Sequence, residues 1–297
     1  MTPTLVRQHR PRAGATPRLD PCARARDWAE IQERMLVPLY EAVYDRLEVG
    51  AGTRLLGLGC GSGLALLMAA SRGAAVTGVD SFAPERLALA RRRLSSGAAG
   101  TRACAHPGLV AGSPGDFRDP AAPTAASGPA DAAAPPYNLV TAFEPIGCAP
   151  GDTEGLDGLL GTAARLSGRG TPVVIAGWGP PERCATASVL RAATEQADPL
   201  RGPDALRTAR RDDLEQAALR AGLRPDGSGR VACPFGYADI DSAVRGLLST
   251  GLLDAAIAAA GLDQVEKELD EALQPYLRQE GPVWMPNVFR YLIARTP

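Results

Sequence analysis

The sequence predicts a parallel α/β fold, in which helices cover both faces of a sheet of about seven strands. Two observations lead to this prediction. An apolar, strand-like run at residues 53–58 passes through a glycine-rich turn into a helix-like run at 64–73. A second strand-like run at 74–80 and a second helix-like run at 84–96 follow at once. This alternation is typical of parallel strands joined by right-handed helical connections.

A helical segment precedes this alternation. Apolar residues in the region 27–48 fall on one helical stripe, namely Ile31, Met35, Leu39 and Val43. Pro38 is expected to divide the segment into two short helices, because proline interrupts a helix interior. Residues 1–26 carry six arginines and one acidic residue without interleaved aromatic residues, so we expect a basic, disordered tail there.

The second half of the chain continues the alternation. A third strand is expected to end near Gly112, and the Ala/Pro-rich stretch 118–136 is expected to be a disordered insertion. Strand-like and helix-like runs then follow at residues 137–143, 154–167, 171–179 and 210–223, with further strands near 229–233 and at 288–295. Amphipathic helices at 239–280, interrupted at Gly251 and Gly261, separate the last two strands.

The composition narrows the class of protein. An apolar fraction of 45% is ordinary for a globular domain, and no apolar run reaches the roughly 18–20 residues of a membrane helix. The N-terminus lacks the apolar segment of a secretory signal, so we expect a cytoplasmic protein without a membrane segment. The six cysteines are scattered without a C-x-x-C pair, which indicates neither a metal site nor a disulfide framework.

The turn after the first strand is the most informative local pattern. Four glycines alternate there with other residues: Gly57, Gly59, Gly61 and Gly63. Such a turn implies that a ligand or a second element approaches bare backbone. It is not the G-x-G-x-x-G motif of dinucleotide folds, because Ser62 or Leu64 stands where the third glycine belongs. The Lys-Ser/Thr pair of a phosphate-binding loop is also absent.

The stretch LLGLGCGSG resembles the first motif of class I S-adenosylmethionine-dependent methyltransferases, and VTGVDSF resembles their second. The resemblance extends over roughly residues 27–295 and is closest to actinobacterial small-molecule members. It implies a Rossmann-like, seven-stranded, mostly parallel sheet with an antiparallel last strand and helices on both faces. The implied methyltransferase domain spans residues 27–297, with helical lids at 27–52 and 239–280.

The resemblance also implies S-adenosylmethionine as the cofactor. Its amino-acid end would lie against the glycine turn, where backbone amides and a helix N-terminus favour a carboxylate. Asp80, at the carboxyl end of the second strand, would accept hydrogen bonds from the ribose hydroxyls. The implied cofactor-binding residues are Gly57, Gly59, Cys60, Gly61, Gly63, Asp80, Ser81, Phe82, Ser113 and Phe143.

Two positions depart from the family pattern. Gly57 stands where the family usually has an acid that helps to bind the ammonium group of the cofactor. Ser113 replaces the acid that contacts adenine, and Pro114 after it has no amide donor. In a shifted register, Asp116 would take that place. These departures keep open a second interpretation, a degenerate methyltransferase-like module for binding or regulation.

Methyl transfer requires alignment and exclusion of water, and it needs a general base only for weakly acidic acceptors. The candidate bases are Glu144 after the fourth strand and His106 in the third-strand region. Four aromatic residues would either line a pocket or pack between helices: Trp28, Tyr40, Tyr44 and Trp178. The D/N-P-P-Y loop of base-methylating enzymes is absent, which disfavours a nucleic-acid substrate. The sequence therefore favours methyl transfer to the oxygen, nitrogen or carbon of a small molecule, with secondary metabolism as the implied setting.

Overall fold

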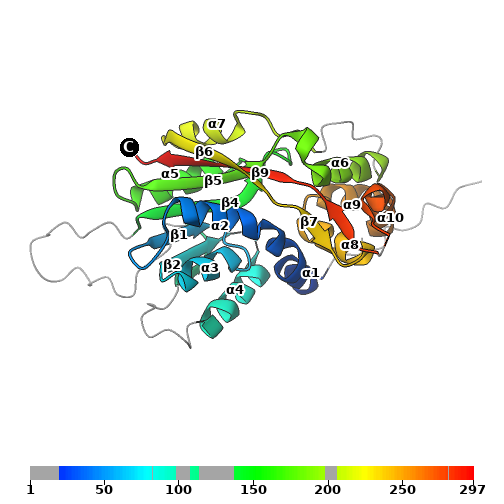
Figure 1. Cartoon of the computed structure of the whole chain (residues 1–297), viewed down its shortest axis with the longest axis horizontal. Coiled ribbons are helices and arrows are strands. Elements are labelled where there is room, and N and C mark those ends of the chain that lie inside the picture. Colours follow the sequence, from blue (N-terminus) through cyan, green and yellow to red (C-terminus); the bar gives the residue numbers. More distant parts are fainter. Residues whose placement is uncertain (1–19, 82, 98–107, 114–136, 198–205, 280) are drawn as a thin grey trace, which may run out of the picture.

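In the computed structural model, a seven-stranded sheet runs through the middle of the molecule (Figure 1). The structure describes residues 20–81, 83–97, 108–113, 137–197, 206–279 and 281–297. In chain order the strands of this sheet are β1 (Arg54–Leu58), β2 (Ala75–Asp80), β3 (Gly108–Ala111), β4 (Leu139–Ile146), β5 (Pro172–Trp178), β6 (Arg224–Ala232) and β9 (Val288–Arg295).

The strand order across the sheet is β3-β2-β1-β4-β5-β9-β6. The five strands from β3 to β5 pair in parallel, whereas β9 lies antiparallel between β5 and β6. This arrangement confirms the predicted Rossmann-like, mostly parallel α/β sheet with an antiparallel last strand. The carboxyl ends of β1, β2 and β4 lie side by side, because these strands are neighbours and run in the same direction.

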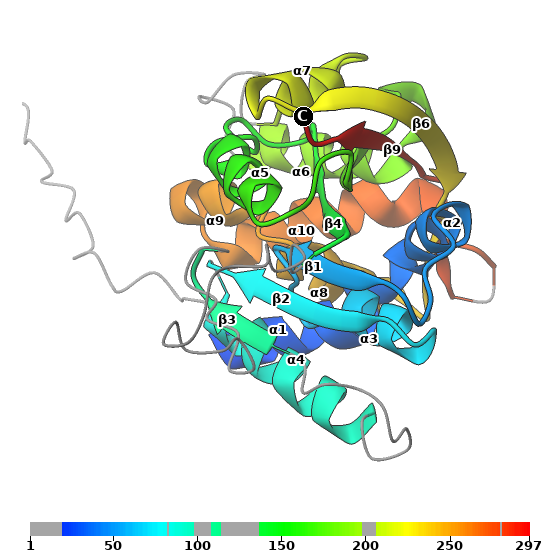
Figure 2. The same cartoon turned by 90° about the vertical axis from the view of Figure 1, so that its left-hand side faces the viewer.

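Helices cover both faces of the sheet (Figure 2). On one face, α5 (Leu156–Arg165) and α7 (Asp213–Arg220) form a core cluster with apolar side chains of β1, β4 and β5. On the other face lie α2 (Val37–Arg46), α3 (Leu64–Ser71) and α4 (Pro84–Gly97). The alternation of a strand divides β1 between the faces, so Leu55 packs with the second group and Leu56 with the first.

The chain between β6 and β9 forms an insertion, which we call the C-terminal insertion. Its elements are β7 (Phe235–Tyr237), α8 (Ile240–Ser249), α9 (Asp254–Ala260), α10 (Leu262–Leu273) and β8 (Val283–Met285). Breaks at Gly251 and Gly261 match the prediction, and both residues have positive φ. The small β7–β8 sheet and helix α6 (Ala185–Ala197), which packs against α10, were not predicted.

The N-terminal segment (residues 20–46) begins earlier than predicted. Asp20 caps α1 (Pro21–Asp27) by accepting hydrogen bonds from the amides of Cys22 and Ala23, so a helix begins within the region 1–26 that the sequence assigns to the tail. A π-helical turn (Trp28–Gln32) and a 3₁₀ turn (Glu33–Leu36) connect α1 to α2. Pro38 lies in the first turn of α2, where its missing amide costs little, as the predicted break requires.

The predicted insertion 118–136 and residues 1–19 of the tail lie outside the described residues. Within the described part of the chain, no single helix is long and apolar enough to cross a membrane. Helices α8 and α9 reach that length only as a pair, which is bent by 103°.

Candidate active site

The glycine turn between β1 and α3 needs glycine for its backbone and for its packing. Gly59, Gly61 and Gly63 have φ values of +58°, +54° and +79°, which side chains disfavour. A Cβ on Gly63 would also lie 2.9 Å from the Cβ of Ala90, so this residue lets α3 and α4 approach each other. The turn is joined to β2 by a backbone hydrogen bond from Cys60 to Val79 of 3.1 Å.

The backbone conformation does not require glycine at position 57, because Gly57 is not among the residues with positive φ. Its glycine is required by packing. It lies on the face of β1 that α3 covers, and a Cβ there would be 2.9 Å from Cδ2 of Leu66. Leu66 is almost fully buried. The acid that the family pattern places at position 57 would therefore require Leu66 to repack, and α3 occupies its space instead.

A cavity lies at the carboxyl ends of β1, β2 and β4, where open α/β sheets bind their ligands. Its floor is the glycine turn, and its walls come from β2, β4, the first turn of α4 and the N-terminal segment. The lining residues outside β1, the glycine turn and α3 are Trp28, Glu33, Leu36, Tyr40, Asp80, Arg86, Thr141, Phe143 and Glu144. The centre of a water-sized sphere can occupy only about 30 Å³ of this cavity, room for about two water molecules.

The structure brings most of the predicted cofactor residues together in this cavity. Those that line it are Gly57, Gly59, Cys60, Gly61, Asp80 and Phe143. Gly63 stands just behind them as the N-cap of α3. Ser81 and Ser113 do not line the cavity; the Ser81 hydroxyl donates to the carbonyl of Gly112 at 2.8 Å, which joins the ends of β2 and β3. The remaining predicted residues lie outside the described residues: Phe82, His106, Pro114 and Asp116.

Asp80 connects the turn to the second strand. Its Oδ2 accepts a hydrogen bond from the amide of Gly61 at 2.9 Å, and its Oδ1 accepts one from Ala83 at 3.1 Å. The side chain is buried and still borders the cavity. Asp80 therefore orders the turn, and its buried carboxylate borders the cavity.

Glu144 lies near the end of β4, on the far wall of the cavity from Asp80. Its Oε2 is 3.4 Å from the point where a Cβ on Gly59 would lie, so the carboxylate faces the glycine turn. The Glu144 residue is exposed to solvent on one side. On its other side it lies against the residues that line the cavity. Loss of hydration raises the pKa of Glu144; Arg86 opposes that shift, and Asp80 and Asp152 add to it. A carboxyl group with a raised pKa is suited to proton transfer.

Arg86 places a positive charge beside the cavity, where it affects the pKa of Glu144. It belongs to the first turn of α4, and its guanidinium lies 4.1 Å from the ring centroid of Trp28. Its Nη2 donates to the carbonyl of Ser249 in α8 at 2.6 Å. Desolvation lowers the pKa of Arg86, while Glu144 and Asp80 raise it. Arg86 thus links α4, the N-terminal segment and the C-terminal insertion around the cavity.

The aromatic residues divide into two groups. Tyr40 and Trp28 line the cavity, and the ring of Tyr40 packs against Phe143 at 4.8 Å between centroids. Tyr44 belongs to the core, where its hydroxyl donates to the carbonyl of Ala65 at 2.9 Å. Trp178 also packs in the core, 4.8 Å from the ring of Phe289. The indole Nε1 of Trp28 is buried, and no described residue accepts its hydrogen.

Cys60 lines the cavity but is not a nucleophile in this environment. Burial raises the pKa of its thiol to about 12, and the negative charges of Asp80 and Glu33 add to the shift. The thiol therefore stays protonated at neutral pH, and the reactive form of cysteine is the thiolate.

Glu33 is a site residue that the sequence did not single out. Its Oε2 accepts hydrogen bonds from the hydroxyl of Ser62 and from Nη1 of Arg93, the latter at 2.8 Å. Its Oε1 accepts from the amide of Leu64 at the start of α3, at 3.3 Å. Glu33 is almost fully buried, so this contact fixes the N-terminal segment to the glycine turn. No short motif marks such a pair, because its partners are far apart in the sequence.

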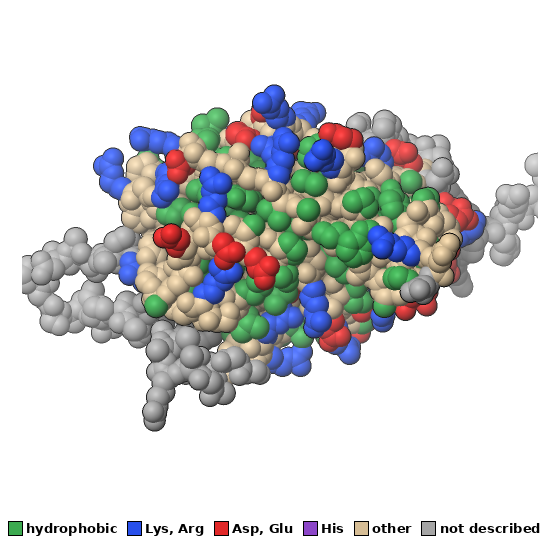
Figure 3. Space-filling model, viewed as in Figure 1, with side chains coloured by type: hydrophobic (Ala, Val, Ile, Leu, Met, Phe, Trp, Pro, Cys, Tyr) green, Lys and Arg blue, Asp and Glu red, His purple; other side chains and the backbone are tan. Residues whose placement is uncertain are grey.

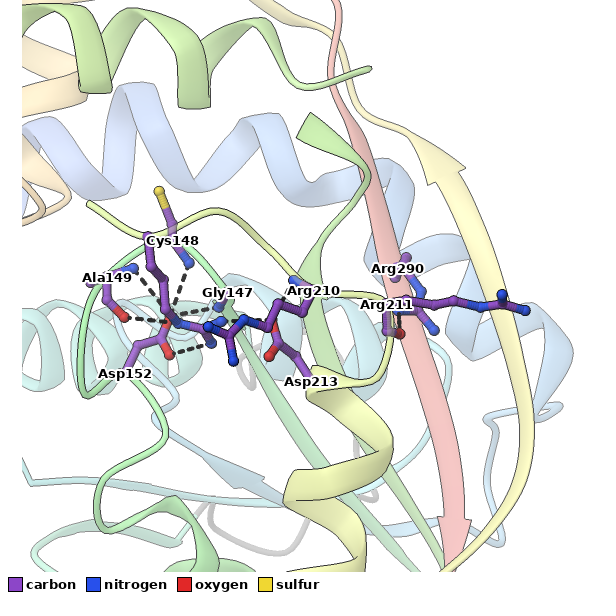
Figure 4. A network of polar contacts seen from close by, with 9 residues as sticks. Gly147, Cys148, Ala149, Asp152, Arg210, Arg211, Asp213 and Arg290 are labelled. Atoms are coloured by element: carbon purple, nitrogen blue, oxygen red, sulfur yellow. Dashed lines mark hydrogen bonds and ion pairs between the residues drawn. The ribbon is translucent and has the colours of Figure 1, made fainter. Parts of the chain in front are cut away.

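The loop after β4 is ordered by a second acidic group, shown in Figure 4. Oδ2 of Asp152 accepts hydrogen bonds from three successive amides, those of Gly147, Cys148 and Ala149. Arg207 bridges Asp152 at 2.9 Å and Asp213, at the start of α7, at 2.7 Å. This network closes the chain just beyond Glu144 and keeps the end of β4 in place.

The fold is shared with solved structures. No protein-family model matches the chain, and no curated protein matches its sequence. A protein of Bacillus halodurans, provisionally described as a methyltransferase, superposes with a TM-score of 0.51 and 12% identity over 87% of this chain and 98% of its own. The YcgJ protein of Bacillus subtilis superposes with a TM-score of 0.51 and 14% identity, covering 89% of this chain and 99% of its own.

The chain has the class I methyltransferase fold. A SAM-dependent methyltransferase of Thiobacillus denitrificans in complex with S-adenosyl-L-homocysteine is less similar, with a TM-score of 0.47, 19% identity, and coverage of 89% of this chain and 92% of its own. At these identities the likeness concerns the fold.

Proposed function

We propose that this protein transfers a methyl group from S-adenosylmethionine to the oxygen, nitrogen or carbon of a small molecule. The observation that carries the proposal is the meeting of the glycine turn, Asp80 and Glu144 in one cavity at the carboxyl ends of the parallel strands. The methyltransferase-type fold supports it. The finer placement, an actinobacterial enzyme of secondary metabolism in the cytoplasm, rests on the sequence resemblance and is part of the proposal.

The residues of the cavity are suited to this cofactor. The bare backbone at Gly59 and Gly61 admits an amino-acid chain, and the N-terminus of α3 favours its carboxylate. Asp80 offers acceptor positions to the ribose hydroxyls, and Phe143 and Tyr40 supply an apolar wall. When bound, the cofactor supplies an electrophilic methyl group. Because the free space is small, side chains of the cavity must shift to admit it.

Glu144 is the proposed general base. Its carboxylate faces the glycine turn across the cavity, where an acceptor group would be placed. There it takes a proton from an acceptor hydroxyl or amine as the new bond forms, and the aromatic walls exclude water. The second candidate, His106, lies outside the described residues.

A small-molecule acceptor is favoured over a nucleic acid. On the face shown in Figure 3, acidic and basic side chains are interspersed, and this view contains no continuous basic surface. Nucleic-acid binding depends on such surfaces. The cavity is enclosed by the N-terminal segment, which also suits a small acceptor.

Calorimetric titration with S-adenosyl-L-homocysteine, the demethylated cofactor, tests the proposal. We expect the wild-type protein to bind it and Asp80→Ala to bind it at least tenfold more weakly, because acceptors for the ribose are removed. Asp226→Ala is the matched control, since Asp226 pairs with Arg295 away from the cavity. No binding by the wild-type protein at millimolar ligand would contradict the proposal.

A second candidate function is a degenerate methyltransferase-like protein that acts as a binding or regulatory module. The packing of Leu66 against Gly57 favours it, because no acid at position 57 holds the ammonium group. The two candidates differ in turnover. Release of labelled methyl groups from S-adenosylmethionine to a panel of small hydroxyl, amine and carbon acceptors supports the enzyme, and tight binding without any transfer supports the module.

A further inference from the structure

Trp28 occupies a special position in the wall of the cavity. It opens the π-helical turn of the N-terminal segment, and such turns are frequent at functional sites. Its Nε1 lies 3.3 Å from the point where a Cβ on Gly61 would be. Because Gly61 has no side chain, the indole edge faces the bare backbone of the glycine turn. Arg86 stacks on the ring at 4.1 Å and holds its plane.

The indole N–H has no acceptor among the described residues, although it is buried. Glu33 and Asp80, two carboxylates of the same cavity, accept from other donors. Glu33 accepts from Ser62, Arg93 and Leu64, and Asp80 accepts from Gly61 and Ala83. A tryptophan N–H can only donate, and buried donors of native proteins nearly always have a partner. An oxygen or nitrogen acceptor other than the described residues would complete this hydrogen bond.

We propose that Trp28 is a ligand-binding residue whose indole N–H donates a hydrogen bond to an oxygen of the S-adenosyl ligand above Gly61. This inference rests on the proposed function and deepens it. The acceptor is a ribose hydroxyl or the amino-acid carboxylate, since both belong to the same ligand and both accept from an N–H. The anchor at Glu33 keeps the donor in place, because it ties the N-terminal segment to Ser62 and Leu64.

The test compares Trp28→Phe with the wild-type protein by calorimetry. Phenylalanine keeps an aromatic ring under Arg86 but removes the N–H. We expect the Kd for S-adenosyl-L-homocysteine to rise about tenfold, the usual value of one such hydrogen bond. Trp284→Phe is the matched control, because Trp284 is 42% exposed on β8 and does not line the cavity; its Kd should stay within about twofold.

A second ligand distinguishes the two acceptors. 5′-Methylthioadenosine has the ribose but lacks the amino-acid carboxylate. If Trp28→Phe weakens both ligands, the acceptor is the ribose, and if it weakens only S-adenosyl-L-homocysteine, the acceptor is the carboxylate. Both results support the proposal. An unchanged Kd for both ligands overturns it. Tighter binding by Trp28→Phe or Trp28→Ala also overturns it, because Trp28 would then be an obstacle in an otherwise intact site.

A spectroscopic measurement covers the case in which Trp28→Phe does not fold. The wild-type chain has three tryptophans, and their indole N–H resonances can be assigned with Trp178→Phe and Trp284→Phe. Titration with S-adenosyl-L-homocysteine should move the Trp28 resonance downfield, as a new hydrogen bond requires, and leave Trp284 unchanged. A Trp28 resonance that does not move during saturation contradicts the proposal. Absence of any binding by the wild-type protein contradicts both the proposed function and this inference.

Discussion

At the scale of single residues, the cavity contains one group, Glu144, whose proposed catalytic role conflicts with the stability of the folded protein. Glu144 is an acid on a wall that disfavours its charge, and its pKa is raised mainly by loss of hydration. A raised pKa in the folded state means that the folded protein binds this proton more tightly than the unfolded chain. The contribution of Glu144 to stability is therefore greatest at low pH and falls as pH rises from the ordinary value of 4.5 through the raised pKa.

Glu144→Gln should separate these two effects. At pH 7 the variant should melt at a slightly higher temperature than the wild-type protein, because a neutral amide avoids the cost of the charge on the cavity side, and solvent exposure keeps that cost small. It should also lose about 10²–10⁴-fold in methyl transfer, the usual contribution of a general base. The wild-type rate should rise with pH through an apparent pKa above 4.5, and this limb should vanish in the variant. Melting curves between pH 4 and pH 8 and initial rates check both points. An unchanged rate contradicts the catalytic role.

At the scale of secondary-structure elements, the N-terminal segment depends on one buried ion pair. Glu33 joins this segment to α3 through Ser62 and Leu64 and to α4 through Arg93. Removing one partner of a buried pair leaves the other without compensation, which typically costs 3–5 kcal/mol. Arg93 retains some exposure, so we expect Glu33→Ala to lower the free energy of unfolding by about 3 kcal/mol.

Asp45→Ala is the control for this prediction. The pair Asp45–Arg72 has a similar distance of 2.6 Å, but the Asp45 side chain is 71% exposed, so its loss should cost less than about 1 kcal/mol. Urea denaturation of the three proteins gives the comparison. Equal losses for both variants would show that the Glu33 contact does not anchor the segment.

These elements also show what the sequence could predict. Strands such as β1 and β9 were found within a residue or two, because their apolar runs end at glycine or polar residues. Trp28 was left open between a pocket and a packing role, and Glu33 was not singled out, since their roles come from contacts with residues about thirty or more positions away, such as Gly61 and Ser62. The reason for Gly57 could not be predicted either. The sequence shows only that glycine replaces the acid usual in the family, and the structure shows that Leu66 occupies the space of a side chain there.

At the scale of the whole molecule, the N-terminal segment and α4 line the cavity over a sheet that holds its floor in place, and the C-terminal insertion packs behind them. The N-terminal segment, α4 and the C-terminal insertion meet through Arg86, which contacts Trp28 and Ser249. Among the described residues, the core cluster on the opposite face, covered by α5 and α7, shares only Leu58 with the lining of the cavity. Ligand binding should therefore order one side of the molecule and leave the other nearly unchanged.

Hydrogen exchange with and without S-adenosyl-L-homocysteine tests this asymmetry. At a free ligand concentration 100 times the Kd, binding adds about 2.7 kcal/mol to the free energy of unfolding, equivalent to a rise of about 5–10 °C in melting temperature. Added protection from local opening should be concentrated in residues 28–40, in the glycine turn and near the end of β4. Helices α5 and α7 serve as the internal control, since they should gain protection only through global unfolding. Protection that is equal on both faces would contradict a ligand site at the glycine turn, because binding would then stabilise the molecule without a local contact there.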